Sequence, residues 1–342
     1  MTLNGSAISG DVLSPGWSSY EWRLRYQTYE VTDLLDPAAA EQVVSATIGN
    51  GWYRGRLGWE GMRHVYGDRR GLLLQLDMLF EDGHVETICS DETWIVEASE
   101  VLADDLYDGQ SIDARRRSRG TPGKSVSRRK KAQSTQRAER ISFRGELVEQ
   151  LGPPVRRHES IAPEAIWQSP AGKTLVDFGQ NLVGWVRLHV QGPEGRVVTL
   201  RHAEVLEDEE LGTRPLRSAR ATDQFTLSGE ADIFEPSFTF HGFRYVEVTG
   251  FPGVLEPHHL SAVVVHSQLE RTGTFTTSNE LLNSFHRNVV WGLRGNFLDV
   301  PTDCPQRDER LGWTGTSPCS HRRPPISTMS ETFSRTGWGP RG

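Results

Sequence analysis

The chain has 342 residues and a formal net charge of −7; 36% of its residues are hydrophobic and 24% are charged, as in globular proteins. No apolar run is long enough to cross a bilayer as a helix, which excludes a helical membrane protein, and the length predicts two or three domains. The three cysteines, Cys89, Cys304 and Cys319, lie far apart without metal-ligand spacing, so we expect no disulfide framework, metal or cofactor. The chain opens without a basic and apolar leader, and we therefore expect a cytoplasmic location.

Short β-rich runs dominate the first third of the chain. Residues 43–48, 72–76 and 94–96 are such runs, and glycine, aspartate or asparagine turn signals separate them. Strands of this length and spacing are typical of a β-sandwich or jelly roll. We assign residues 1–114 to an N-terminal domain of this kind.

Four aromatic residues of this region lie near glycines or turns: Trp17, Tyr20, Trp52 and Tyr53. Their flat faces could stack on a sugar ring. Aromatic side chains beside glycines also commonly fill the corners of β-sandwiches. We favour packing in the corners and keep a sugar-stacking patch as the alternative.

Residues 115–144 interrupt the β pattern with twelve lysines or arginines against one acid, Glu139. The rest of the chain is strongly acidic and would repel nucleic-acid phosphate. Neither aromatic interleaving nor a recognition fold accompanies the basic run. We therefore predict an irregular basic linker over residues 115–145, or a segment translated out of frame, and no nucleic-acid partner.

A second β-rich region spans residues 146–267. Residues 174–188 alternate between apolar and polar side chains on both sides of a central turn, which predicts two strands. Polar residues between the strands that could reach a ligand are His202, Glu204, His241 and Arg244. For lone histidines a structural role is more common. We predict a second β-sandwich domain here and no doubly wound parallel sheet.

A helix is predicted over about residues 278–294. Thr277 and Glu280 have the spacing of a capping box, and apolar residues follow with a helical period: Leu281, Leu282, Phe285, Val289 and Leu293. Gly292 and Gly295 then favour the end of the helix. Without a partner, the apolar face of this helix would promote aggregation.

Residues 291–315, WGLRGNFLDVPTDCPQRDERLGWTG, concentrate the side chains that sugar chemistry needs. Tryptophans flank a cluster of three carboxylates and two arginines, and two prolines stand at its start: Asp303, Arg307, Asp308, Glu309 and Arg310. Carboxylates beside an aromatic platform, with arginines to bind hydroxyls, are the components of a glycoside-cleaving site. Taken singly, each residue could be only a helix cap, a solvated ion pair or a core residue. The local pattern predicts extended chain before Pro301, then a short helix that Asp303 caps and that carries Glu309.

The same segment resembles the signature of bacterial α-L-rhamnosidases, the inverting glycoside hydrolases of family 78. Further stretches, such as GNGWYRGRLGW and FEPSFTFHGFRYVEVTG, resemble the β-domains of that family. The resemblance covers residues 3–113 and 146–315. It implies a mainly β, multidomain chain with two β-sandwich-like domains, and then, over residues 268–315, the start of an (α/α)6 barrel. It also implies hydrolysis of terminal α-L-rhamnose from rhamnose-containing glycosides or oligosaccharides.

By this resemblance, four residues acquire roles in the site. Glu309 aligns with the general acid, Asp303 and Arg307 with residues that hold the rhamnose hydroxyls, and Trp313 with the hydrophobic platform. A general acid must keep its proton near neutral pH, and an apolar wall such as Trp313 favours that. The general base of the family would be a glutamate far beyond residue 342.

The resemblance stops after Gly315. The family has an aspartate where this chain has Thr316, and residues 316–342 are rich in Ser, Thr, Pro, Gly and Arg without an amphipathic period. We interpret this tail as an unstructured product of a one-base deletion, which leaves the barrel incomplete. The sequence thus predicts a rhamnosidase-family chain with feeble activity at most. The alternative is a non-catalytic carbohydrate-binding protein made of the β-domains.

Overall fold

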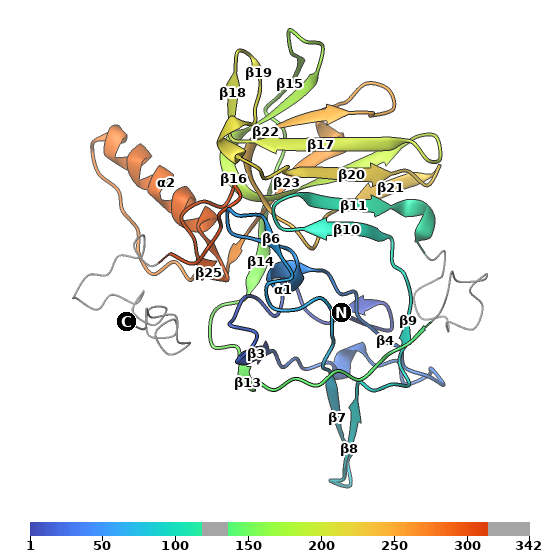
Figure 1. The fold of residues 1–342 in the computed structure, drawn as a ribbon. Coiled ribbons are helices and arrows are strands. Elements are labelled where there is room, and N and C mark those ends of the chain that lie inside the picture. Colours follow the sequence, from blue (N-terminus) through green and yellow to red (C-terminus); the bar gives the residue numbers. More distant parts are fainter. Residues whose placement is uncertain (118–135, 314–342) are drawn as a thin grey trace.

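The computed structural model describes residues 1–117 and 136–313. In these ranges the chain is mainly β, with one long helix beside a large curled sheet (Figure 1). The predicted fold class is therefore confirmed. No helix in the described ranges is long and apolar enough to cross a membrane.

The first region consists of short strands and brief helical turns. Its strands are β1 (Thr2–Leu3), β2 (Ser6–Ala7), β3 (Arg23–Tyr26), β4 (Val44–Ser45), β5 (Arg56–Leu57), β6 (Met62–Arg63), β7 (Gln75–Leu79), β8 (Val85–Cys89), β9 (Ile95–Val96), β10 (Val101–Asp105) and β11 (Gly109–Asp113). Its helices are η1 (Thr32–Leu34), α1 (Gly51–Arg54) and η2 (Ala114–Arg116). Most of these strands form two- or three-stranded sheets, and the hairpin β7–β8 projects away from the rest (Figure 1).

The second region contributes most of a ten-stranded sheet. Its remaining elements are β12 (Gln136–Arg137), β13 (Glu146–Glu149), β14 (Val155–Ile161), β15 (Ala165–Gln168), β16 (Thr174–Gln191), β17 (Val197–Ala203), β18 (Val205–Glu207), β19 (Glu210–Gly212), η4 (Arg214–Leu216), β20 (Thr222–Thr226), β21 (Ala231–Phe234), β22 (His241–Thr249), η5 (Pro257–His259) and β23 (Leu260–Ser267). The order in the sheet is β10-β11-β20-β17-β22-β16-β23-β14, and β15 and β21 also pair with β16. All of its described pairings are antiparallel except β11 with β20.

The parallel pairing of β11 with β20 joins the first region to the second. Ser111, Ile112 and Asp113 lie opposite Gln224, Phe225 and Thr226 in register. Backbone hydrogen bonds therefore cross between segments that lie more than a hundred residues apart in the sequence. The large sheet is not confined to the second β-rich region of the sequence.

The aromatic residues near the glycines of the first region pack inside the molecule. Trp17, Tyr20 and Trp52 are buried in one apolar cluster with Trp185 of β16. Tyr53 is partly buried against the same cluster. The prediction that these side chains pack in corners is confirmed for the three buried residues, and they are not available to stack on a sugar.

The long helix α2 spans Glu280–Gly295, within two residues of the predicted range. Its cap differs from the prediction: Asn279 is the N-cap and its side chain accepts a hydrogen bond from the backbone of Leu281, so the capping box starting at Thr277 is wrong. The helix also continues through Gly292 and is closed by Asn296. Asparagine is as good an N-cap as threonine, which explains the later start.

One apolar face of α2 is exposed to solvent. Leu281, Leu282, Phe285 and Val289 are all exposed, as the prediction for an unpartnered face requires. At its C-terminal end the helix contacts the sheet, where a side chain at Gly295 would meet Val183 of β16. The hairpin of β24 (Phe297–Leu298) and β25 (Val300–Pro301) follows directly.

The basic segment is described only at its two ends. Arg115 in η2 forms an ion pair with Asp113, which precedes that helix, and Arg117 forms an ion pair with Glu100. At the other end, β12 pairs with β9. This end of the segment therefore contains a short strand, whereas the prediction was an irregular linker, because β9 offers it backbone hydrogen bonds. The central residues 118–135 lie outside the described residues, and so do the predictions made for them.

Candidate active site

The loop that carries the predicted site begins at the β24–β25 hairpin. Asp299 makes the turn with a φ of 69°, and the chain then runs from Thr302 to Gly312, where these two residues form an isolated antiparallel bridge. Within this described stretch no helix forms, so the predicted short helix carrying Glu309 is wrong.

The side chain of Arg310 explains why the loop is not helical. Its guanidinium donates hydrogen bonds to the carbonyl oxygens of Gln306 and Arg307, at 3.1 Å each. In a helix these carbonyls would accept backbone N–H groups three or four residues later. Arg310 itself has a φ of 48°, which is incompatible with a right-handed helix.

Three of the four predicted site residues come together in this loop. One carboxylate oxygen each of Asp303 and Glu309 and the sulfur atom of Cys304 all lie within 4.8 Å of one another. Arg307 Nε donates to Glu309 Oε2 at 3.0 Å. Asp303, Arg307 and Glu309 therefore form one polar cluster, with the thiol of Cys304 beside them.

Trp313 lies at the end of the loop. Its backbone N–H donates to the carbonyl oxygen of Pro301 at 2.8 Å, and its side chain is 53% exposed. Its role as a platform stays a prediction.

An arginine that the sequence analysis did not single out completes the cluster. Arg217 Nη1 lies 3.1 Å from Glu309 Oε2, on the same oxygen that Arg307 contacts. The closest charged neighbours of the Glu309 carboxyl are thus guanidinium groups, where an apolar wall was expected. Arg217 lies 92 positions before Glu309, and no local pattern connects the two.

Cys304 is buried and keeps its proton. Burial raises the pKa of the Cys304 thiol to about 12, and a hydrogen bond with Asp303 acts in the same direction. A protonated, buried thiol is a poor nucleophile.

Asp308 and Arg310 are both buried, and neither belongs to a solvated surface pair. The Asp308 carboxylate accepts hydrogen bonds from the backbone and the hydroxyl of Ser218. The Arg310 guanidinium lies between the rings of Tyr107 and Phe240, 4.9 and 4.7 Å from their centroids. Burial lowers the pKa of Arg310 to about 10, so it remains a cation at neutral pH. Both side chains fix the loop to the β regions.

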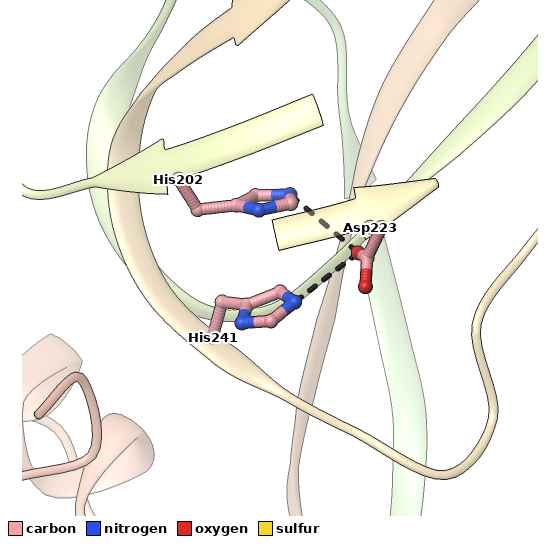
Figure 2. Close-up of side chains that lie close together, drawn as sticks. All are labelled: His202, Asp223 and His241. Carbon is pink, nitrogen blue, oxygen red and sulfur yellow. Dashed lines mark hydrogen bonds and ion pairs between the residues drawn. The ribbon is translucent and has the colours of Figure 1, made fainter. Parts of the chain in front are cut away.

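A second polar cluster lies inside the large sheet (Figure 2). His202, Asp223 and His241, from β17, β20 and β22, are fully buried. His241 Nε2 lies 3.1 Å from Asp223 Oδ2, and His202 Nδ1 lies 2.9 Å from the carbonyl oxygen of Ala221. Burial lowers the pKa of His202 to about 3, so this imidazole is neutral.

These residue types could ligate a metal. The two imidazole rings stack with centroids 4.2 Å apart and an interplanar angle of 19° (Figure 2). One nitrogen of each ring and one oxygen of Asp223 all lie within 4.8 Å of one another, and both rings face the Asp223 carboxylate. The two other polar residues considered in this region also have partners: Glu204 accepts from Asn181, and Arg244 pairs with Asp177.

Comparison with known proteins decides the family. Three domain models match consecutive parts of the chain: the α-L-rhamnosidase N-terminal domain over residues 1–159, the bacterial α-L-rhamnosidase concanavalin-like domain over 167–266, and the bacterial α-L-rhamnosidase 6 hairpin glycosidase domain over 270–326. The chain belongs to the bacterial α-L-rhamnosidase family. The candidate site and α2 both lie in the part matched by the 6 hairpin domain.

Individual α-L-rhamnosidases support the assignment. The chain is 43% identical to an α-L-rhamnosidase of Streptomyces avermitilis, over 92% of this chain and 30% of that protein. It is 36% identical to one from Formosa agariphila, over 92% of this chain and 34% of that protein. The chain thus spans about a third of the length of the curated relatives it matches.

Solved structures agree with the fold. The native α-L-rhamnosidase of Aspergillus terreus superposes with a TM-score of 0.83 at 44% identity, over 92% of this chain and 36% of that one. The Streptomyces avermitilis α-L-rhamnosidase complexed with L-rhamnose gives a TM-score of 0.82 at 41% identity, over 92% and 30%.

Proposed function

We propose that the loop 302–313 forms one side of a site for the terminal α-L-rhamnose of a glycoside. The observation that carries the proposal is the convergence of Asp303, Arg307 and Glu309 on a loop fixed to both β regions. A relative with 41% identity whose structure was solved with L-rhamnose bound supports the choice of sugar.

Each of the four residues has a distinct chemical role in this proposal. The Asp303 carboxylate accepts hydrogen bonds from sugar hydroxyls, and the Arg307 guanidinium donates to them. Trp313 covers an apolar face of the ring. Glu309 protonates the departing glycosidic oxygen as general acid, while a water molecule attacks the opposite face of the sugar with the help of a general base.

Binding of L-rhamnose to residues 1–342 tests the proposal. Isothermal titration calorimetry should show saturable binding that Asp303→Ala or Arg307→Ala removes. Arg214→Ala is the matched control, because Arg214 is exposed and pairs with Glu207, away from the loop. Binding that all three variants retain would overturn the assignment of the site.

Turnover separates the enzyme from the alternative, a non-catalytic carbohydrate-binding protein. The alternative has support because the chain spans about a third of the length of its relatives. The candidate acid Glu309 lies in the part matched by the 6 hairpin domain, and that match covers only residues 270–326. An aryl α-L-rhamnoside that is bound and cleaved with inversion supports the enzyme. Binding of the same compound without cleavage supports the binding protein.

A further inference from the structure

The carboxyl of Glu309 is contacted by two arginines on one of its two oxygens. Arg307 Nε and Arg217 Nη1 lie 3.0 and 3.1 Å from Oε2. Arg307 belongs to the same loop as Glu309, whereas Arg217 reaches in from the second β region, just after η4. Two regions of the chain therefore meet at a single oxygen atom.

The backbone conformation at Arg217 directs this side chain toward the loop. Arg217 has a φ of 56°, a conformation that costs a non-glycine residue about 1 kcal/mol or more. The next residue, Ser218, donates its backbone N–H to Asp308 Oδ2 at 3.2 Å. Arg56 Nη1 donates to the carbonyl oxygen of Ser218 at 3.0 Å. These two contacts hold the backbone that directly follows the strained residue.

We propose that Arg217 is a positioning residue that, together with Arg307, fixes Oε2 of Glu309 and so selects Oε1 as the oxygen that carries the acid's proton. Guanidinium groups donate to the lone pairs of an oxygen and are repelled by a proton on it. With both arginines on Oε2, the proton is favoured on Oε1. This inference rests on the proposed role of Glu309 as the general acid.

The other groups around Glu309 do not determine which of its two carboxyl oxygens carries the proton. Asp303 and Cys304 lie within 4.8 Å of it on the same loop, and the Cys304 thiol is protonated. Asp308 Oδ1 lies 4.0 Å from Arg217 Nη1, further than Glu309 Oε2. Tyr107 contacts only the backbone carbonyl of Glu309. In the described part of the chain, Arg217 and Arg307 are the cations hydrogen-bonded to this carboxyl.

Of the two arginines, Arg217 is the more accessible. Its side chain is 49% exposed, against 29% for Arg307. A more exposed ion pair is the easier one to exchange for water or for a sugar hydroxyl.

The ¹³C resonance of the Glu309 carboxyl tests the inference on residues 1–342 without any need for turnover. The protein is labelled with ¹³C at the glutamate carboxyl carbons, and Glu309→Gln assigns the resonance. In Arg217→Met the resonance should shift from its wild-type position at constant pH, because one guanidinium hydrogen bond to the carboxyl is gone. Arg217→Lys should restore part of the difference.

Arg214→Met is the matched control. It removes an arginine three residues away that pairs with Glu207, and the Glu309 resonance should not move. An unchanged Glu309 resonance in Arg217→Met would overturn the inference, and so would an equal shift in Arg214→Met. Failure of L-rhamnose binding, by contrast, concerns only the proposed function.

A second measurement covers the case in which Arg217→Met does not fold. Rotation of the Arg217 guanidinium, followed by ¹⁵N exchange spectroscopy, should be slow in the wild-type chain. It should become faster in Glu309→Gln, because the charged acceptor is lost. Unchanged rotation in Glu309→Gln would show that Arg217 does not hold the carboxyl.

Discussion

The hydroxyl of Tyr107 donates a hydrogen bond of 2.6 Å to the backbone carbonyl oxygen of Glu309, 202 residues further along the chain. The same hydroxyl accepts the backbone N–H of Gly58 at 2.9 Å. Burial raises the pKa of Tyr107, so its hydroxyl keeps the proton that it donates. The first β region therefore supports the backbone of the candidate acid directly.

Tyr107→Phe should loosen the loop and destabilise the chain. The change leaves the Gly58 N–H and the Glu309 carbonyl without their shared partner, which costs about 1–3 kcal/mol for buried groups. Urea unfolding measures the loss, and amide hydrogen exchange should speed up over residues 306–310. The exposed Tyr26 provides a control, since Tyr26→Phe should leave both measurements unchanged. Wild-type exchange in Tyr107→Phe would contradict the role assigned to this hydrogen bond.

Arg310→Lys should destabilise the chain although it conserves the charge. Arg310 donates to four backbone carbonyls from a planar group held between two rings, and an ammonium group cannot reproduce that fork. Carbonyls left without donors predict a loss of about 3 kcal/mol in the free energy of unfolding. Arg287→Lys, at an exposed pair with Glu280, should change it by less than about 0.5 kcal/mol. Similar losses in both variants would contradict this account.

Local pattern predicted the mainly β fold and the position of α2, because alternation and helical periodicity report which residues face a core. It failed at the loop 302–312. There the prolines and Asp303 resemble a helix start, but contacts from Leu106 and Phe240 hold Arg310 and override that local preference. Tertiary contacts of this kind join residues that are far apart in the sequence, so a short window of sequence does not predict them.

The candidate site was predicted only as far as its residues are close in sequence. The resemblance to the rhamnosidase signature singled out Asp303, Arg307 and Glu309 within one short segment, and their roles stay predictions. Arg217 was missed, since it reaches Glu309 from another strand region and is one of many arginines. A φ above zero at a non-glycine residue marks its special position, and that property appears only in the structure.

Stability should fall as the pH is lowered through the range in which histidine titrates. Burial lowers the pKa of His202 to about 3 and that of His266 to about 4. An unfolded imidazole titrates near 6.5, so below that pH the unfolded chain binds protons that the folded chain does not, and acid favours unfolding. Each such histidine contributes a slope of up to about 1.4 kcal/mol per pH unit.

His202→Gln should make this slope shallower between pH 6 and pH 4. The variant keeps a side chain that can donate to Ala221 but cannot titrate, and urea midpoints at a series of pH values measure the change. A wild-type slope in His202→Gln would mean that the buried histidine does not take up its proton on unfolding.

Residues 1–342 by themselves should bind L-rhamnose but cleave aryl α-L-rhamnosides feebly at most. Glu309 can supply an acid, but inversion also needs a base about 6.5–9.5 Å away with water between the two. The family resemblance puts that base in a part of the barrel that these residues do not contain. The missing base alone costs about 10²–10⁴-fold in rate, and lost positioning of the sugar adds to this.

A version in which the reading frame is restored at Thr316 and continued through a complete barrel should hydrolyse the same glycosides with inversion. Thr316 and the tail lie outside the described residues, so this prediction rests on the sequence and on the share of the relatives that the chain spans. In that longer protein Glu309→Gln should abolish turnover of unactivated glycosides while L-rhamnose binding persists, because the amide keeps the shape of the acid and loses its proton. Product stereochemistry by NMR and initial rates provide the measurements. Robust turnover by purified residues 1–342 would show that a base is available within them, and the assignment of the acid and base would then have to be revised.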